Sequence, residues 1–113
     1  IVNISSVFGV VSKARRAVYS TTKWGIIGFT KAISLDLAPY NILVNSVSPG
    51  FVDTELTRKI LSDLEIKDII DTIPQGRLAN VDEIAQTIIF LSSENNSYIT
   101  GQNIIIDGGF TSA

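Results

Sequence analysis

Apolar residues recur along the first half of this chain at two spacings, one typical of strands and the other of helices. Ile1–Ser6 alternates weakly and predicts a buried strand of a parallel sheet. Val18–Ala38 carries apolar residues at helical spacing, and Pro39 is expected to close this helix. Ile42–Val47 predicts a second strand, which Ser48-Pro49-Gly50 should break.

The second half repeats this alternation of helix and strand. Thr54–Asp71 has apolar residues at helical spacing but mixed charge and no strong caps. A further helix is predicted to begin at Asn80 and to end near residue 92, because Glu83 can reach back to the cap as in a capping box. Asn103–Asp107 predicts a third strand. The order predicts an α/β fold with right-handed crossovers, a Rossmann-like parallel sheet and flanking helices.

The chain shows no repeat or linker, so we expect its 113 residues to form one unit. It contains no Met and begins within a strand pattern at Ile1. We therefore expect the fold to be truncated at its amino-terminal side. A mature terminus left by removal of a signal segment is the alternative.

Composition excludes several classes of function. The formal net charge of −2 gives no basic stripe for nucleic acid. Zero Cys excludes disulfides and thiolate chemistry, and zero His excludes a histidine-based triad and most zinc sites, so no metal site is expected. No apolar run approaches the roughly 18 residues of a membrane span, and a cytoplasmic location is the expectation.

Tyr19 and Lys23 stand four residues apart near the start of the predicted helix, on one face of it. An ammonium beside a phenol stabilises the phenolate, which gives a proton donor and acceptor for carbonyl/alcohol interconversion. Ser6 ends a predicted strand, where open α/β sheets place their ligands, and its hydroxyl could polarise a carbonyl. We predict that Ser6, Tyr19 and Lys23 form a catalytic set.

Each of these residues also has a plainer interpretation. A serine at this place can cap a loop, which suits Ser5 equally well, although Ser5 stands one residue too far from Tyr19. Tyr19 could be a half-buried tyrosine, and Lys23 a solvated lysine. Because Cys and His are absent, few other groups could do acid/base work near neutral pH, and we favour the catalytic interpretation.

Four motifs resemble, in order, those of the classical short-chain dehydrogenases/reductases, and most of all the 3-oxoacyl-carrier-protein reductases among them. They are Ile-Ser-Ser-Val-Phe-Gly at 4–9, Tyr-Ser-Thr-Thr-Lys at 19–23, Val-Asn-Ser-Val-Ser-Pro-Gly at 44–50 and Ile-Asp-Gly-Gly at 106–109. The resemblance covers nearly the whole chain but only the later half of the family's domain. It implies that residues 1–113 are the carboxyl-terminal part of one dinucleotide-binding oxidoreductase domain.

The resemblance also implies a reaction, in which hydride passes between NAD or NADP and a small-molecule carbonyl carbon. Tyr19 would exchange the proton with the carbonyl oxygen, and Lys23 would bind the nicotinamide ribose, so both would contact the cofactor. A ketoacyl thioester, a sugar and a steroid all suit these motifs. The alternative is a non-catalytic, incomplete family member that acts as an oligomerising structural module.

Pro49 to Thr54 directly follow the second predicted strand and would hold the cofactor. Pro49 and Gly50 form the turn, and Gly50 would let the backbone approach a ligand closely. By resemblance, the backbone of Val52 holds the nicotinamide carboxamide and Thr54 contacts the cofactor. An ordinary Pro-Gly turn is the alternative interpretation of this segment.

Some of the family's features have no counterpart here. The T-G-x-x-x-G-x-G turn that grips the pyrophosphate, the Asn-Asn-Ala-Gly segment and the catalytic Asn are missing, and the residue that selects NAD or NADP is missing too. We therefore expect this chain alone to be inactive. Residues 55–74 match the family's mobile substrate lid, although a solvated amphipathic helix pair fits them equally. Arg77, Asp82 and Glu83 are interpreted as structural, and Asp107-Gly108-Gly109 as a turn near a subunit contact.

The long helix predicts assembly. Gly25 and Gly28 lie inside it, and each costs about 1 kcal/mol relative to Ala unless close backbone approach to the sheet or to a second subunit offsets it. We predict a homo-oligomer, a dimer or tetramer, with Trp24, Gly28, Phe29 and Ala32 near a helix–helix contact. A monomer whose helix lies under an absent amino-terminal half is the alternative.

Overall fold

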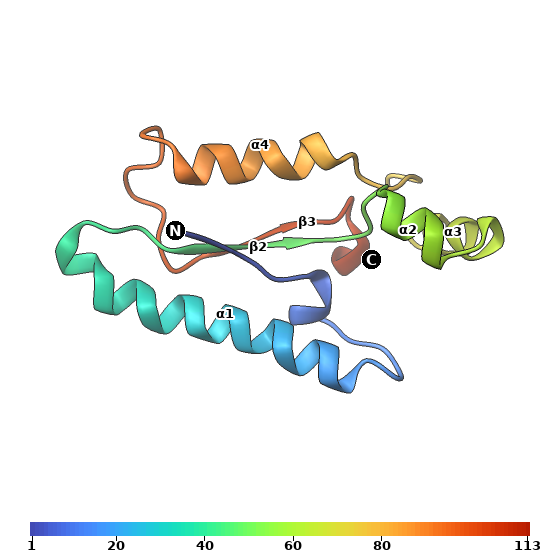
Figure 1. Ribbon diagram of the computed structural model, residues 1–113, viewed down its shortest axis with the longest axis horizontal. Coiled ribbons are helices and arrows are strands. Elements are labelled where there is room, and N and C mark those ends of the chain that lie inside the picture. Colours follow the sequence, from blue (N-terminus) through green and yellow to red (C-terminus); the bar gives the residue numbers. More distant parts are fainter.

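The computed structural model describes all residues, 1–113, and contains one parallel sheet of three strands. The strands are β1 (Val2–Ile4), β2 (Asn45–Pro49) and β3 (Asn103–Ile106), in the order β1-β2-β3. All three run in the same direction, so their carboxyl ends meet at one end of the molecule (Figure 1). The predicted α/β fold with a parallel sheet is confirmed.

Four α-helices and three short 3₁₀ turns complete the chain. Helices α1 and α4 cover opposite faces of the sheet, and α2 and α3 project beyond the carboxyl ends of the strands (Figure 1). None of the helices combines the length and the apolar character that crossing a bilayer requires. The elements are α1 (Ala17–Leu37), α2 (Glu55–Ile60), α3 (Asp63–Ile70), α4 (Val81–Ser92), η1 (Val7–Gly9), η2 (Ala38–Tyr40) and η3 (Phe110–Ser112).

Helix α1 begins and ends within one residue of its predicted bounds, and α4 begins directly after Asn80. The Glu83 carboxylate accepts a 2.7 Å hydrogen bond from the Asn80 N–H, as the capping pattern predicted. The segment 54–71 forms two helices, and the expectation that it has no strong caps is wrong, because Thr54 caps α2 and a capping box of Ser62 with Glu65 begins α3.

Strand β2 is displaced from its predicted position. It begins at Asn45, not at Ile42, and it continues through Ser48 to Pro49, where a break was expected. The polar residues fit because their side chains find hydrogen-bond partners inside the sheet. Pro49 fits because the next N–H, that of Gly50, makes the hydrogen bond to Ile106 O at 2.8 Å.

The two crossover connections have opposite hands. Both step across the sheet in the same direction, from β1 to β2 and from β2 to β3, yet α1 and α4 lie on opposite faces (Figure 1). The prediction that both are right-handed is therefore wrong for one of them. The rule applies to a strand that feeds directly into its crossover helix, whereas α2 and α3 intervene between β2 and α4.

Apolar side chains fill the face of the sheet that α4 covers. Val47 of β2 is fully buried and packs with Ile84 and Leu91 of α4. Val2 and Ile104 from the neighbouring strands pack against this cluster. Full burial of such a side chain contributes about 1.5–3 kcal/mol, so this cluster stabilises the packing of α4 on the sheet.

Small polar side chains line the face that α1 covers. Asn103 Oδ1 accepts hydrogen bonds from the buried hydroxyls of Ser46 at 2.9 Å and Ser48 at 2.7 Å. Asn3 Nδ2 donates to the Thr30 hydroxyl of α1 at 2.9 Å. No buried side-chain nitrogen or oxygen in the chain lacks a partner. Directional hydrogen bonds therefore join α1 to the sheet.

Candidate active site

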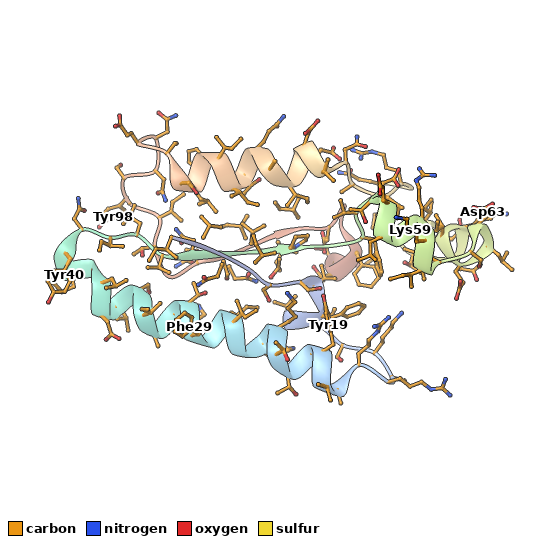
Figure 2. All side chains as sticks on the ribbon, viewed as in Figure 1. Tyr19, Phe29, Tyr40, Lys59, Asp63 and Tyr98 are labelled. Carbon is orange, nitrogen blue, oxygen red and sulfur yellow. The ribbon has the colours of Figure 1, made fainter.

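A cleft of about 330 Å³ opens at the carboxyl ends of the strands, beside the first turn of α1. Ser6, just after β1, and Tyr19, in the first turn of α1, both line it. Gly50, just after β2, lines it as well. Figure 2 shows Tyr19 at the end of α1 that lies nearest to α2, far from Tyr40 at the other end. The topology thus brings together two of the predicted catalytic residues.

Ser6 ends the extended segment and begins the turn η1. Its side chain is 8% exposed, and its Oγ accepts a hydrogen bond from the Phe8 N–H at 3.2 Å. This is the capping role considered for it. Because Oγ acts there as an acceptor, the hydroxyl proton remains available for a second partner in the cleft.

Phe8 packs directly against Tyr19. The two rings meet edge to face, with centroids 6.3 Å apart, and Tyr19 is 43% exposed. Phe8 also meets Phe51 at 6.1 Å, and Phe51 meets Phe110 at 5.3 Å, both edge to face. A chain of aromatic contacts therefore runs from Tyr19 to the carboxyl-terminal turn and restricts the orientation of the phenol ring.

Lys23 lies one turn after Tyr19 on the same side of α1, as predicted. Its Nζ is 5.7 Å from the Tyr19 ring centroid and donates a hydrogen bond to Ile4 O at 3.1 Å. The Lys23 carbonyl accepts a hydrogen bond from Ser5 Oγ at 2.8 Å, which gives the neighbouring serine a structural role. The Lys23 ammonium is thus held between the end of β1 and the phenol ring.

Gly50 sits where the chain leaves the sheet. A Cβ at this position would lie 2.8 Å from the Asp107 Cα, so only glycine allows the two backbones to approach so closely. The Asp107 carboxylate accepts hydrogen bonds from the Thr111 N–H and hydroxyl. Burial alone would raise the pKa of Asp107, but these bonds and backbone donors in the turn outweigh it and lower the pKa. The predicted turn at 107–109 is confirmed, with Gly109 at φ +92°.

Only one of the two backbone polar groups of Val52 is hydrogen-bonded within the chain. Its carbonyl accepts a hydrogen bond from the Thr57 hydroxyl at 2.8 Å, and the residue bridges to Ala79. The Val52 N–H donates to no acceptor in the chain. Thr54 caps α2, and its Oγ1 accepts a hydrogen bond from the Thr57 N–H at 3.1 Å. The Val52 N–H is thus one of the free backbone donors that this loop offers beside the cleft.

Leu56 and Ile60 of α2, with Leu61 directly after the helix, form an apolar wall of the cleft. Leu56 and Ile60 are 65% and 68% exposed, because α2 packs against little else. An exposed apolar wall beside the reactive groups is compatible with the predicted substrate lid and with the alternative of a solvated helix pair. The lid therefore stays a prediction.

The neighbouring charged residues form structural pairs. The Arg58 guanidinium donates two hydrogen bonds to the Asp53 carboxylate, and these bonds lower the pKa of Asp53. Arg77 forks Glu83 in the same way, which with a backbone N–H lowers the pKa of Glu83 from 4.5 to about 2. A hollow of about 130 Å³ next to this second pair includes none of the three predicted catalytic residues, so we assign the site to the larger cleft.

The sequence-based prediction named neither Phe8 nor Arg16 as a site residue, although both line the cleft. Phe8 lies within a quoted motif, but nothing in the sequence indicates that η1 turns its ring onto Tyr19. Arg16 directly precedes α1, outside the predicted helix, so no helical spacing indicated that it lines the cleft with Tyr19.

Residues 1–111 match the family model described as Enoyl-(Acyl carrier protein) reductase. The chain is 47% identical over 109 residues to the 3-oxoacyl-(acyl-carrier-protein) reductase FabG of Aquifex aeolicus (strain VF5). That match covers 96% of this chain and 44% of the relative.

Two solved structures have the same fold along the whole chain. One is 4-hydroxyisoleucine dehydrogenase complexed with NADH, with a TM-score of 0.93 and 37% identity. The other is a gluconate 5-dehydrogenase from Burkholderia cenocepacia J2315 in complex with NADP and tartrate, with a TM-score of 0.92 and 37% identity. This chain covers 47% and 45% of them, so it spans less than half the length of these two proteins.

Proposed function

The chain belongs to the short-chain dehydrogenase/reductase family, and on that premise we propose that the natural protein is a cytoplasmic NAD(P)-dependent oxidoreductase that interconverts a small-molecule carbonyl and an alcohol. The observation that carries the proposal is the single cleft lined by both Ser6 and Tyr19. The Lys23 ammonium beside the Tyr19 ring supports it. The cofactor is NAD or NADP, as in the solved relatives with NADH and NADP.

Two side chains act on the substrate oxygen in this proposal, and a third acts on one of them. During reduction, the Ser6 hydroxyl donates a hydrogen bond to the carbonyl oxygen and polarises it. The Tyr19 hydroxyl then gives its proton to that oxygen, and the Lys23 ammonium stabilises the phenolate that remains. The nicotinamide, when bound, supplies or takes the hydride. Oxidation of an alcohol uses the same proton transfers in reverse.

The loop after β2 fits a nicotinamide. Its free Val52 N–H can bind the carboxamide, and Gly50 brings backbone to the cleft. Pro49 and Thr54 bound this loop, and Lys23 would bind the ribose. No segment of the chain matches the Gly-rich turn that grips a pyrophosphate, so we expect the isolated 113-residue chain not to reduce carbonyl compounds. NAD(P)H oxidation by that purified chain would contradict this expectation.

Assembly through α1 is a second part of the proposal. Trp24 and Phe29 are 53% and 56% exposed, and a Cβ at Gly25 or Gly28 would touch nothing in the chain. The sheet therefore does not explain these glycines, whereas close approach of a second copy would, and Ala32 extends the same side of the helix. We expect light scattering of the natural protein to give a dimer or tetramer. A monomer across micromolar concentrations would contradict this.

The test of catalysis compares two tyrosines of the natural gene product. Tyr19→Phe removes the proposed proton donor and should reduce kcat for carbonyl reduction by about two to four orders of magnitude. Tyr40→Phe is the control, because Tyr40 is exposed at the far end of α1. Fold and cofactor affinity should change little in both variants. Turnover near wild type in Tyr19→Phe would refute the acid/base role.

A further inference from the structure

Positive charge is concentrated at the beginning of this acidic chain. Residues 1–35 contain five of the nine Lys and Arg residues and no Asp or Glu, and the first carboxylate is Asp36. The overall net charge of −2 conceals this asymmetry. Because this segment also supplies Ser6 and Tyr19, its charge acts on the proposed active site.

Three cations of this segment line the cleft or the hollow that adjoins it, without a carboxylate beside them. Arg16 lines the cleft beside Tyr19, and it also lines an adjoining hollow with Arg15 and Lys23. Neither lining contains an Asp or Glu. By contrast, the two arginines elsewhere in the chain, Arg58 and Arg77, each form an ion pair with a carboxylate. This chain therefore supplies no carboxylate partner for the positive charge at the cleft.

This arrangement does not favour the fold itself. Arg16 stands at the N-cap of α1, its side chain makes no capping hydrogen bond, and the first turn contains no acidic residue. A cation at the positive end of a helix dipole is unfavourable by roughly 0.3–1 kcal/mol. Arg16 thus goes against the preference for acidic residues at a helix N-terminus and gives the fold nothing in return. Such exceptions are typical of functional positions.

We propose that the substrate carries an anionic oxygen group, a carboxylate or a phosphate, that Arg16 binds while the reacting carbonyl lies at Tyr19. This inference rests on the oxidoreductase function proposed above and names its substrate class. A guanidinium presents a fork of donors that matches both anions. Arg16 directly precedes α1 and lines the same cleft as Tyr19, so the spacing between the bound anion and the reacting carbonyl is that of two groups within one small cleft. A short oxo acid or keto phosphate fits this spacing and the cleft's size.

The experiment compares charged and neutral substrates of similar shape with the natural gene product. The pairs are pyruvate, acetoacetate and levulinate, each with its methyl ester, and dihydroxyacetone phosphate with dihydroxyacetone. The variant Arg16→Gln removes the charge and keeps donors. Lys31→Gln is the control, because Lys31 lies on α1 but lines neither hollow.

We expect the wild type to prefer at least one anion over its neutral partner. Arg16→Gln should lower kcat/KM for that anion about 10- to 100-fold, mainly through KM, the loss typical of one hydrogen bond to a charged group. The neutral partner and the control should change little. The acid-against-phosphate comparison identifies the anion.

Several results would overturn the proposal. They are an unchanged preference in Arg16→Gln, a wild type that favours the neutral partners, and a requirement for a substrate attached to an acidic carrier protein. If none of these compounds is reduced, the oxidoreductase function is tested separately by NAD(P)H oxidation with other carbonyl compounds. Calorimetric titration of the Tyr19→Phe variant with the same pairs then measures binding of the anions without turnover. Equal affinity for the charged and the neutral partners would refute the proposed anion site.

Discussion

The two faces of the sheet are joined to their helices by different forces. On the α4 face, Val47 packs against Ile84 and Leu91, and exclusion of water provides the attraction. On the α1 face, buried polar groups such as Asn3 and Thr30 are joined by hydrogen bonds. Apolar contact is non-directional, whereas a hydrogen bond weakens steeply when its length or angle changes. The helix that carries the proposed catalytic residues is therefore held in a defined position.

This difference separates stability from positioning. Loss of an apolar side chain on the α4 face should lower the stability of the fold and leave the geometry of the cleft intact. Loss of a hydrogen bond on the α1 face should cost less stability but displace Tyr19 and Lys23. A displacement of about 1 Å can reduce turnover about a hundredfold, so the second kind of change should be visible in kcat.

The largest effect on stability is expected for Leu91→Ala. Leu91 is 5% exposed in the α4 cluster, and such a truncation lowers the free energy of unfolding by about 2–5 kcal/mol. Urea unfolding measures this loss, and kcat of the folded protein should be unchanged. Ile89→Ala on the same helix is the control, because Ile89 is 65% exposed. Equal losses of stability in the two variants would contradict the claim that the buried face of α4 stabilises the fold.

A smaller loss of stability is expected for Thr30→Val. The variant keeps the shape of the side chain but leaves Asn3 Nδ2 without its acceptor, which costs about 1–3 kcal/mol. Adding Asn3→Leu should recover much of this stability, whereas kcat should stay low in both variants because α1 has lost its bond to the sheet. Thr22→Val, at an exposed position of the same helix, is the control. Full kcat in Thr30→Val would show that the bond does not position the site.

Phe8→Leu should have a moderate effect on turnover. An edge-to-face aromatic pair contributes about 0.5–1.5 kcal/mol, so looser packing of Tyr19 should reduce kcat by up to about tenfold. Cofactor affinity, measured by fluorescence titration, should be unchanged. Phe90→Leu, on the outer side of α4, should leave both quantities at the wild-type level. Equal kcat in the two variants would exclude a positioning role for Phe8.

The smallest effect concerns acid stability near the start of α4. The pKa of Glu83 is lowered to about 2 by Arg77, so the pair contributes stability fully above pH 4.5 and loses it as pH falls toward 2. Glu83→Gln should therefore differ most from wild type in urea midpoint near neutral pH and least near pH 2. Asp82→Asn should show no such convergence, because Asp82 forms no ion pair. A constant difference across this range would contradict the assignment.

Local signals explain what could be predicted from the sequence. The bounds of α1 and the capping of α4 by Glu83 depend on residues near one another in the chain, and both were predicted correctly. The placement of Ser6 and Tyr19 in one cleft followed from the rule that ligands bind at the carboxyl ends of parallel strands.

Long-range partners explain what could not be predicted. Strand β2 was misplaced because Ser46 and Ser48 resemble loop residues until Asn103, far along the chain, accepts their hydrogen bonds. The hand of the second crossover depends on how α2 and α3 carry the chain to the other face. The contact of Phe8 with Tyr19 depends on the turn η1, which no local signal indicated.

The most direct test of the account is a crystal structure of the natural gene product with bound NAD(P)⁺. We predict that the nicotinamide lies over the cleft between Ser6 and Tyr19, with the Lys23 ammonium on the ribose. The carboxamide should accept from the Val52 N–H at a hydrogen-bond distance of about 2.7–3.2 Å. A nicotinamide bound away from this cleft, or a ribose out of reach of Lys23, would contradict the proposed catalytic set.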